Sequence, residues 1–130
     1  MDNKIEYALN LKHTRCNCAQ AVIMAYQDEL GLTEEQICAI GSGFGTGMGN
    51  TKGVCGALIG ATIVAGLLNK SGVNTKLIAS DMMDRFIEES KALYCGDLKG
   101  VKTHQMLTSC DDCITNAIKI LDDTLLNINK

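Results

Sequence analysis

The chain has 130 residues, the length of one ordinary domain and enough to bury a hydrophobic core without disulfide cross-links. Its 12 basic and 15 acidic residues give a net charge of −3, and no lysine- or arginine-rich run is present, which excludes nucleic acid as an expected partner. The charged amino terminus has no apolar signal-peptide core, so we expect no export, no transmembrane segment and a cytoplasmic location, where thiols stay reduced.

Apolar residues follow a helical period along nearly the whole chain, and proline is absent. We therefore expect a single all-α domain over residues 1–130, a bundle of five or six helices around a central apolar helix. On that central helix Gly56 and Gly60 are four residues apart, which predicts a groove for a neighbouring helix. The predicted helices cover about residues 4–12, 18–30, 33–40, 54–68, 74–94 and 109–126.

Several polar residues mark the ends of these helices. Asn17 can cap the second helix, and Gly31 suits the left-handed position after it. Thr33 opens the capping-box sequence Thr-Glu-Glu-Gln before the third helix. Ser109 and Asp112 form a similar capping pair before the last helix.

A glycine-rich loop separates the third and fourth helices, since six of the thirteen positions in residues 41–53 are glycine. It contains neither a G-x-G-x-x-G sequence nor a P-loop, so a nucleotide site is not indicated. We interpret it as backbone that passes close to Cys55 and can present N–H groups to an anion or a sulfur cluster, the alternative being a plain flexible connection. The candidate cofactor-binding positions are Gly45, Gly47, Gly53 and Gly56.

Cysteine is the residue type in this sequence that is best able to carry out redox chemistry or bind metals. The seven cysteines are Cys16, Cys18, Cys38, Cys55, Cys95, Cys110 and Cys113. Cys18, Cys55 and Cys113 each fall in the first turn of a predicted helix, and Cys95 falls at the end of the fifth. The positive end of a helix favours a thiolate over a thiol, so cysteines placed there can attack disulfides or bind metals.

The other candidates have simpler interpretations. Cys38 is best read as a small buried hydrophobe, and Cys16 belongs to a Cys-x-Cys sequence that carries little information by itself. Cys110 opens a Cys-x-x-Cys sequence, but no βαβ pattern surrounds it, so both a redox role and an incidental one stay open. His13 and His104 are expected to be solvated loop residues.

The sequence Ser-Gly-Phe-Gly-Thr-Gly-Met-Gly at residues 42–49, followed by Cys-Gly-Ala-Leu-Ile-Gly at residues 55–60, resembles the C_GCAxxG_C_C family of redox-active proteins. This bacterial and archaeal family has about this length, and the resemblance covers most of the chain. It implies four signature cysteines, matched here by Cys18, Cys55, Cys95 and Cys113, with Cys16 or Cys110 as the alternative to its near neighbour. Cys16, Cys38 and Cys110 are then additional.

Three functions remain open. The first is a thiol–disulfide oxidoreductase or electron-transfer protein, with Cys55 as nucleophile, Cys95 or Cys18 as resolving thiol and an unidentified redox partner protein. The second is a zinc or iron–sulfur protein that uses the four signature cysteines as metal ligands. The third is a non-redox helical interaction module, which could be a homo-oligomer. The first two require that folding gathers the cysteines into one pocket.

Overall fold

The computed structural model describes residues 2–130 and confirms an all-α fold. The helices are α1 (Asp2–Thr14), α2 (Cys18–Met24), α3 (Gln27–Leu30), α4 (Glu34–Gly41), α5 (Gly45–Met48), α6 (Gly56–Leu68), α7 (Thr75–Ser90), α8 (Cys95–Lys99) and α9 (Cys110–Ile128). The predicted number, five or six, is too low for this part of the chain, which forms nine. The difference comes from the short helices α3, α5 and α8, which the periodicity assigns to loops or to longer helices.

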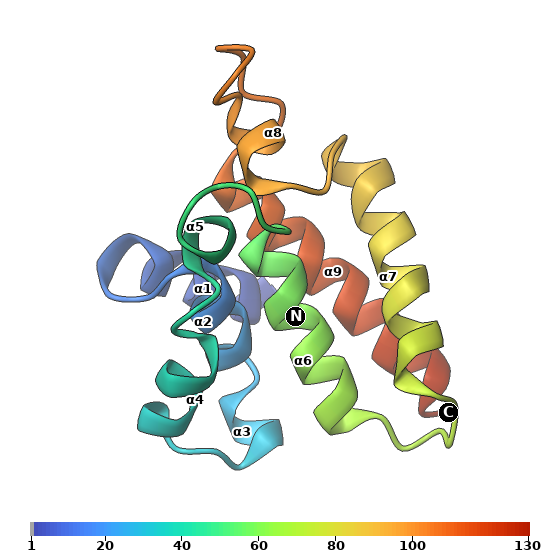
Figure 1. Cartoon of the computed structure of the whole chain (residues 1–130). Helices are drawn as coiled ribbons and strands as arrows, with labels where there is room; N and C mark the ends of the chain where they lie inside the picture. The colour runs from blue at the N-terminus through green and yellow to red at the C-terminus, as the bar shows by residue number, and fades with distance from the viewer. Residues whose placement is uncertain (1) are drawn as a thin grey trace.

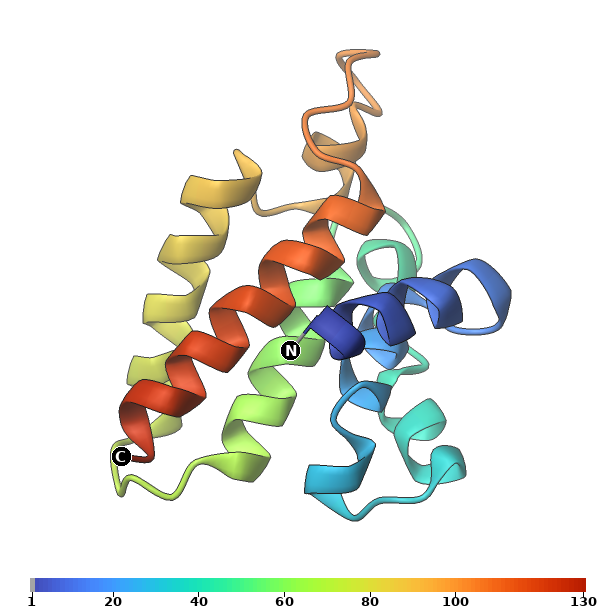
Figure 2. The same ribbon diagram turned by 180° about the vertical axis from the view of Figure 1, so that it is seen from behind.

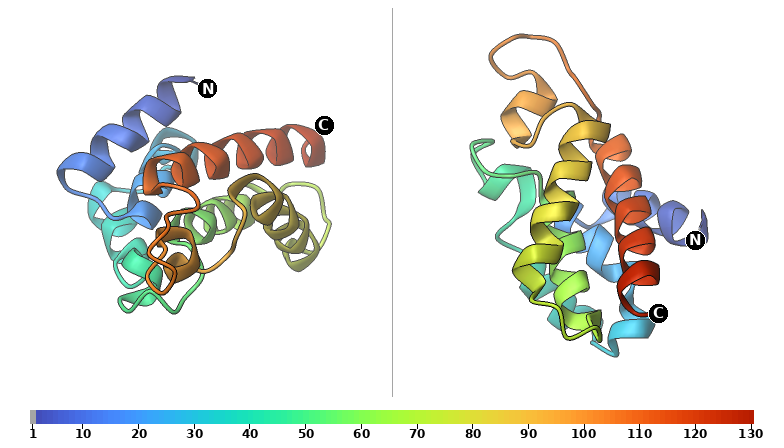
Figure 3. Two further views of the ribbon diagram at one scale, coloured as in Figure 1. Left: turned by 90° about the horizontal axis from the view of Figure 1, so that it is seen from above. Right: turned by 90° about the vertical axis from the view of Figure 1, so that its right-hand side faces the viewer.

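Helix α6 lies between two groups of helices (Figures 1 and 2). It packs against α2 on one side and against α7 and α9 on the other, while α1 packs against both α2 and α9. Figure 3 shows α7 and α9 running alongside each other on one flank. None of the helices formed by residues 2–130 combines the length and apolar character needed to span a bilayer.

Two glycines on α6 allow close packing, Gly60 against α2 and Gly56 against Phe44, the residue before α5. A β-carbon on Gly60 would lie 2.7 Å from the carbonyl oxygen of Ala19, and one on Gly56 would lie 2.7 Å from that of Phe44. Real side chains do not tolerate such distances, so only glycine fits at either position. The close approach brings Cys18, at the start of α2, beside the first turn of α6.

The predicted caps are confirmed. The side chain of Asn17 accepts a hydrogen bond from the Gln20 N–H, and Gln20 completes the capping box by accepting from the Asn17 N–H. Thr33 makes the equivalent box at α4, and Ser109 accepts from the N–H of its third following residue at α9. Gly31 adopts the left-handed conformation with φ of 67°. Each of these bonds joins residues at most three apart, which is why the sequence reveals them.

The predicted second helix, residues 18–30, is broken in the structure. It ends after Met24, and Tyr26 takes a non-helical conformation with φ of −108° and ψ of 17°. The Tyr26 ring is fully buried, and its hydroxyl donates a 2.5 Å hydrogen bond to Asp122 Oδ1 on α9. The break therefore coincides with a tertiary contact that local periodicity does not report.

The predicted fifth helix also ends early. Helix α7 stops at Ser90, and Lys91 turns into the left-handed region with φ of 78°. Cys95 consequently begins α8, and its expected position at the end of the fifth helix is wrong. The reason is a backbone pairing of residues 93–95 with residues 53–55, which a continuing helix would not allow.

Candidate functional site

A short backbone pairing holds two of the predicted cysteines near each other. Val54 and Tyr94 form an isolated antiparallel bridge. On either side of it, the Cys55 N–H donates to the Leu93 carbonyl and the Cys95 N–H donates to the Gly53 carbonyl, both at 2.9 Å. These bonds place the start of α6 and the start of α8 at the same end of the molecule (Figures 1 and 3).

The glycine-rich loop packs against this pairing. Thr46, Gly47 and Met48 are consecutive residues with positive φ, so the chain makes a left-handed turn inside α5. A β-carbon on Gly47 would lie 2.5 Å from the β-carbon of Cys95, so the absence of a side chain lets the loop lie directly on that cysteine. The Gly53 N–H donates to the carbonyl of Gly47 at 3.0 Å, which closes the turn.

The four glycines named as candidate cofactor positions therefore lie close to other parts of the protein. The missing β-carbon of Gly45 faces Asn17, and that of Gly53 faces the carbonyl of Gly47. Gly56 faces the carbonyl of Phe44. The structure accounts for these glycines by close packing. Their proposed binding of a cofactor stays a prediction.

The first thiol pair joins the starts of α2 and α9. Cys18 is the first residue of α2 and Cys110 the first residue of α9, and their thiols lie close enough for a hydrogen bond between them to shift both pKa values. Cys18 is buried, whereas Cys110 is half-buried. We call Cys18 and Cys110 the outer pair.

The hydrogen bond shifts the pKa values of the two outer-pair thiols in opposite directions. It lowers the pKa of Cys110 to about 6, opposed by burial and helped by the positive charges of Lys99 and Lys12. The same bond, together with burial, raises the pKa of Cys18 far above its usual range. The pair therefore favours the thiolate at Cys110 and the protonated thiol at Cys18.

The second thiol pair joins the starts of α6 and α9. Cys55 occupies the N-cap position of α6, and the thiol of Cys113, in the first turn of α9, lies close enough for a hydrogen bond between them to shift both pKa values. Both cysteines are buried. We call Cys55 and Cys113 the inner pair. Cys110 and Cys113 lie three residues apart on α9, so one helical turn connects the two pairs.

The pKa values of the two inner-pair thiols are also shifted in opposite directions. The bond from Cys113 lowers the pKa of Cys55 against the effect of burial, and the N–H groups of Ala57 and Leu58 lower it further. These N–H groups do not form a conventional cap hydrogen bond, but they point their positive ends at the sulfur. Bonding to Cys55 and burial raise the pKa of Cys113. The inner pair thus favours the thiolate at Cys55 and the protonated thiol at Cys113.

Cys95 lies beside the two pairs without a thiol hydrogen bond of its own. It is buried, and burial raises its pKa, with Lys99 acting in the opposite direction. The charges of Cys55 and Cys110 also raise it, which shows that these sulfurs are neighbours. All seven cysteines are uncrosslinked thiols in the structure.

The remaining sequence candidates lie outside this cluster. Cys16 is buried near Cys38, and burial is the main cause of its raised pKa. The exposed His13 bonds Asp111 Oδ2 at 2.8 Å, next to Cys110, so it is not simply solvated as expected. His104 is exposed in the loop before α9.

Folding thus brings the sequence-predicted residues Cys18, Cys55, Cys95 and Cys113 to one end of the bundle. Cys110 joins them, although the sequence left its role open. Its signal was the Cys-x-x-Cys spacing directly after the cap Ser109, which places both thiols in the first turn of one amphipathic helix.

A family model described as "Putative redox-active protein (C_GCAxxG_C_C)" matches residues 16–124. The chain belongs to the C_GCAxxG_C_C family. The match spans all seven cysteines, so the C_GCAxxG_C_C assignment covers the outer pair, the inner pair and the glycine-rich loop. No curated protein and no solved structure matches the chain. The family description carries redox activity without naming a reaction.

Metal binding was the alternative use of the same thiols. The donor chemistry would suit zinc or an iron–sulfur cluster, each of which takes a shell of four ligands. Within residues 2–130, however, no group of three or more histidine, cysteine, aspartate or glutamate side chains has the arrangement needed to hold a metal ion. Four thiols of the C_GCAxxG_C_C centre instead lie in two pairs, the outer pair and the inner pair. Metal binding stays a prediction.

Proposed function

We propose that this protein is a thiol–disulfide redox protein that exchanges electrons with the disulfide of a partner. The observation that carries the proposal is that two pairs of neighbouring thiols lie together, connected by one turn of α9. In each pair one sulfur is the stronger acid and the other retains the proton. That is the division of roles that an attacking thiolate and a resolving thiol require.

Cys110 makes the first attack, because it is the most acidic member and the least buried of the four paired thiols. Its thiolate attacks one sulfur of the partner disulfide, forms a mixed disulfide and releases the other partner sulfur. Cys18 then attacks the Cys110 sulfur and expels the second partner sulfur. The Cys18–Cys110 disulfide is formed, the partner gains two thiols, and two electrons and two protons have moved.

The oxidation then passes to the inner pair. Cys55, the more acidic thiol of the inner pair, attacks the sulfur of Cys110 and releases Cys18, which takes up a proton. Cys113 next loses its proton, attacks Cys55 and releases Cys110, leaving one disulfide between Cys55 and Cys113. No electrons enter or leave in this step, and the outer pair is free to reduce a second partner disulfide.

Cys113 is therefore proposed as the resolving thiol for Cys55, instead of Cys95 or Cys18 as the sequence suggested. Cys113 is the thiol that bonds Cys55, whereas Cys95 lies nearby without such a bond. Lys12 and Lys99 support the outer pair, because both favour the Cys110 thiolate. The same positive charge favours a partner disulfide in an acidic surface.

The proposal is tested by titrating the fully reduced protein with a small disulfide without oxygen, counting the remaining thiols and mapping the new bonds by mass spectrometry. We expect four thiols to be lost quickly, as Cys18–Cys110 and Cys55–Cys113. In Cys110→Ser only the inner pair should form, and at least about tenfold more slowly because the low-pKa attacking thiolate is missing.

Cys38→Ser is the matched control, because it removes a thiol outside the cluster and should leave the rate and the four-thiol loss unchanged. Seven thiols that react at one slow rate would contradict the proposal. A normal rate in Cys110→Ser would contradict the assignment of Cys110 as the first nucleophile.

A further inference from the structure

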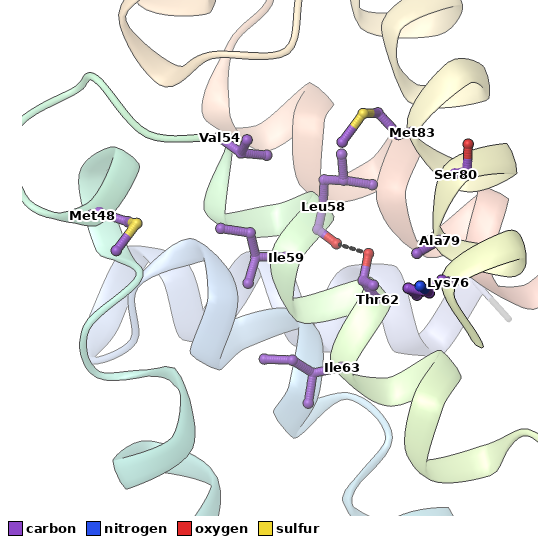
Figure 4. A pocket seen from close by; sticks show the side chains of 10 residues that line it. All are labelled: Met48, Val54, Leu58, Ile59, Thr62, Ile63, Lys76, Ala79, Ser80 and Met83. Carbon is purple, nitrogen blue, oxygen red and sulfur yellow. Dashed lines mark hydrogen bonds between the residues drawn. The ribbon is translucent and has the colours of Figure 1, made fainter. Parts of the chain in front are cut away.

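A second feature of the surface is an apolar groove between α6 and α7. Its volume is about 750 Å³, and its walls include Met48, Leu58, Ile59, Ile63 and Met83, with Lys76 at one side. Figure 4 shows Met48 and Lys76 on opposite sides of the α6 side chains. This face of α6 is only half-buried at Ile59 and Ile63, in contrast to its fully buried opposite face.

The polar groups in the groove are few and gathered around Lys76. In the part of the chain that the structure describes, Lys76 is the only charged side chain that lines it, with the hydroxyls of Thr62 and Ser80 as further polar groups. Thr62 Oγ1 already donates to the Leu58 carbonyl at 2.8 Å, so it can only accept a hydrogen bond from a ligand. Among residues 2–130 no carboxylate forms a salt bridge with Lys76. An apolar channel with one available cation at its side is complementary to an amphiphilic anion.

The size of the groove favours a small molecule over a protein surface. Ten residues line it, whereas a stable protein interface uses about 20–30 residues on each side. Its volume lies within the roughly 300–1,000 Å³ of small-molecule sites, which also combine apolar walls with a few polar groups. Met48 and Met83 are 58% and 37% exposed, and flexible methionines adapt to apolar ligands of variable shape.

We propose that the groove binds an unbranched fatty acid, with its carboxylate at Lys76 and its acyl chain lying across Ile59 toward Met48. The chain buries apolar surface that α6 otherwise leaves half-exposed, and the ammonium of Lys76 neutralises the carboxylate at the open side. Cys55 does not line the groove, so the fatty acid would not contact its sulfur.

The test uses dodecanoate and dodecanol as probes, with binding to the reduced full-length protein measured by isothermal titration calorimetry. The wild-type protein should bind dodecanoate more tightly than dodecanol. Lys76→Glu should weaken dodecanoate at least about fivefold, because attraction becomes repulsion, and leave dodecanol nearly unchanged. Lys70→Ala, a lysine outside the groove, is the matched control and should leave both affinities unchanged.

A second variant, Ala79→Phe, fills the groove from the α7 side and should abolish binding of both probes, while circular dichroism confirms its fold. The inference is overturned if dodecanoate does not bind, or if Lys76→Glu affects both probes equally. Sedimentation that shows a stable dimer of the free protein, dissociating in Ala79→Phe, would assign the groove to a second copy and also overturn it. Thiol titration of these variants should match wild type, so failure here leaves the redox proposal standing.

Discussion

The β-carbon that Gly47 lacks would lie 2.5 Å from the β-carbon of Cys95. This contact joins the glycine-rich loop to a signature cysteine, and it explains how the loop packs directly beside the thiols. The φ of +59° at Gly47 is a second reason for glycine at this position, because side chains rarely adopt it.

Gly47→Ala should destabilise the protein by about 1–3 kcal/mol, since the new methyl group clashes with Cys95 and strains the backbone. Chemical denaturation measures the change. Gly43→Ala is the control, because no atom lies within 4 Å of its missing β-carbon. Equal stability of the two variants would mean that the loop does not rest on Cys95.

The acidity of Cys110 should depend on Cys18. In the wild-type protein the alkylation rate of Cys110 should rise with pH around a midpoint of about 6, because the thiolate is the reactive form. Cys18→Ala removes the donated hydrogen bond, which is the largest cause of the lowered pKa, so the midpoint should move upward toward that of an ordinary thiol at about 8.5.

The measurement is the pH profile of iodoacetamide labelling, followed on the peptide that contains Cys110. Cys38→Ala should leave the profile unchanged, since Cys38 is not among the groups that shift the pKa of Cys110. A midpoint that stays near 6 in Cys18→Ala would assign the acidity to Lys12 and Lys99 instead.

The bond between Tyr26 and Asp122 should hold the break between α2 and α3 in place. Tyr26→Phe removes the donor of this 2.5 Å bond and should cost about 1–3 kcal/mol of folding free energy, because a half-buried carboxylate loses its partner. Thermal unfolding gives the value. Tyr7→Phe, at a tyrosine that is 43% exposed, should have little effect, and an equally small effect of Tyr26→Phe would show that the bond is dispensable.

The metal-binding alternative makes a distinct prediction. If the thiols act in pairs, protein purified without oxygen should contain less than one zinc or iron per chain, and its paired thiols should react without a chelator. Iron, sulfide and zinc analysis together with thiol counting decides the matter. One metal per chain that is lost in Cys113→Ser, but retained in Cys38→Ser, would favour metal binding over the thiol proposal.

Much of the helical framework could be predicted because its signals are local. The caps at Asn17, Thr33 and Ser109 act through bonds to residues at most three positions away, and apolar periodicity identified the long helices. The close packing at Gly56 and Gly60 could also be predicted, since residues four apart lie on one face of a helix. The family signature pointed to four of the five clustered cysteines.

The sequence by itself determined the all-α class, the capped starts of α2, α4 and α9, and the abundance of thiols, since these depend on neighbouring residues and composition. Only the tertiary structure decided that the thiol of Cys18 lies beside that of Cys110, that the thiol of Cys55 lies beside that of Cys113, and that Cys95 begins a helix. The physical reason is that these contacts join segments far apart in the chain. Their geometry is set by the packing of α2, α6 and α9 together and by the backbone pairing between Val54 and Tyr94, neither of which has a signature in local sequence.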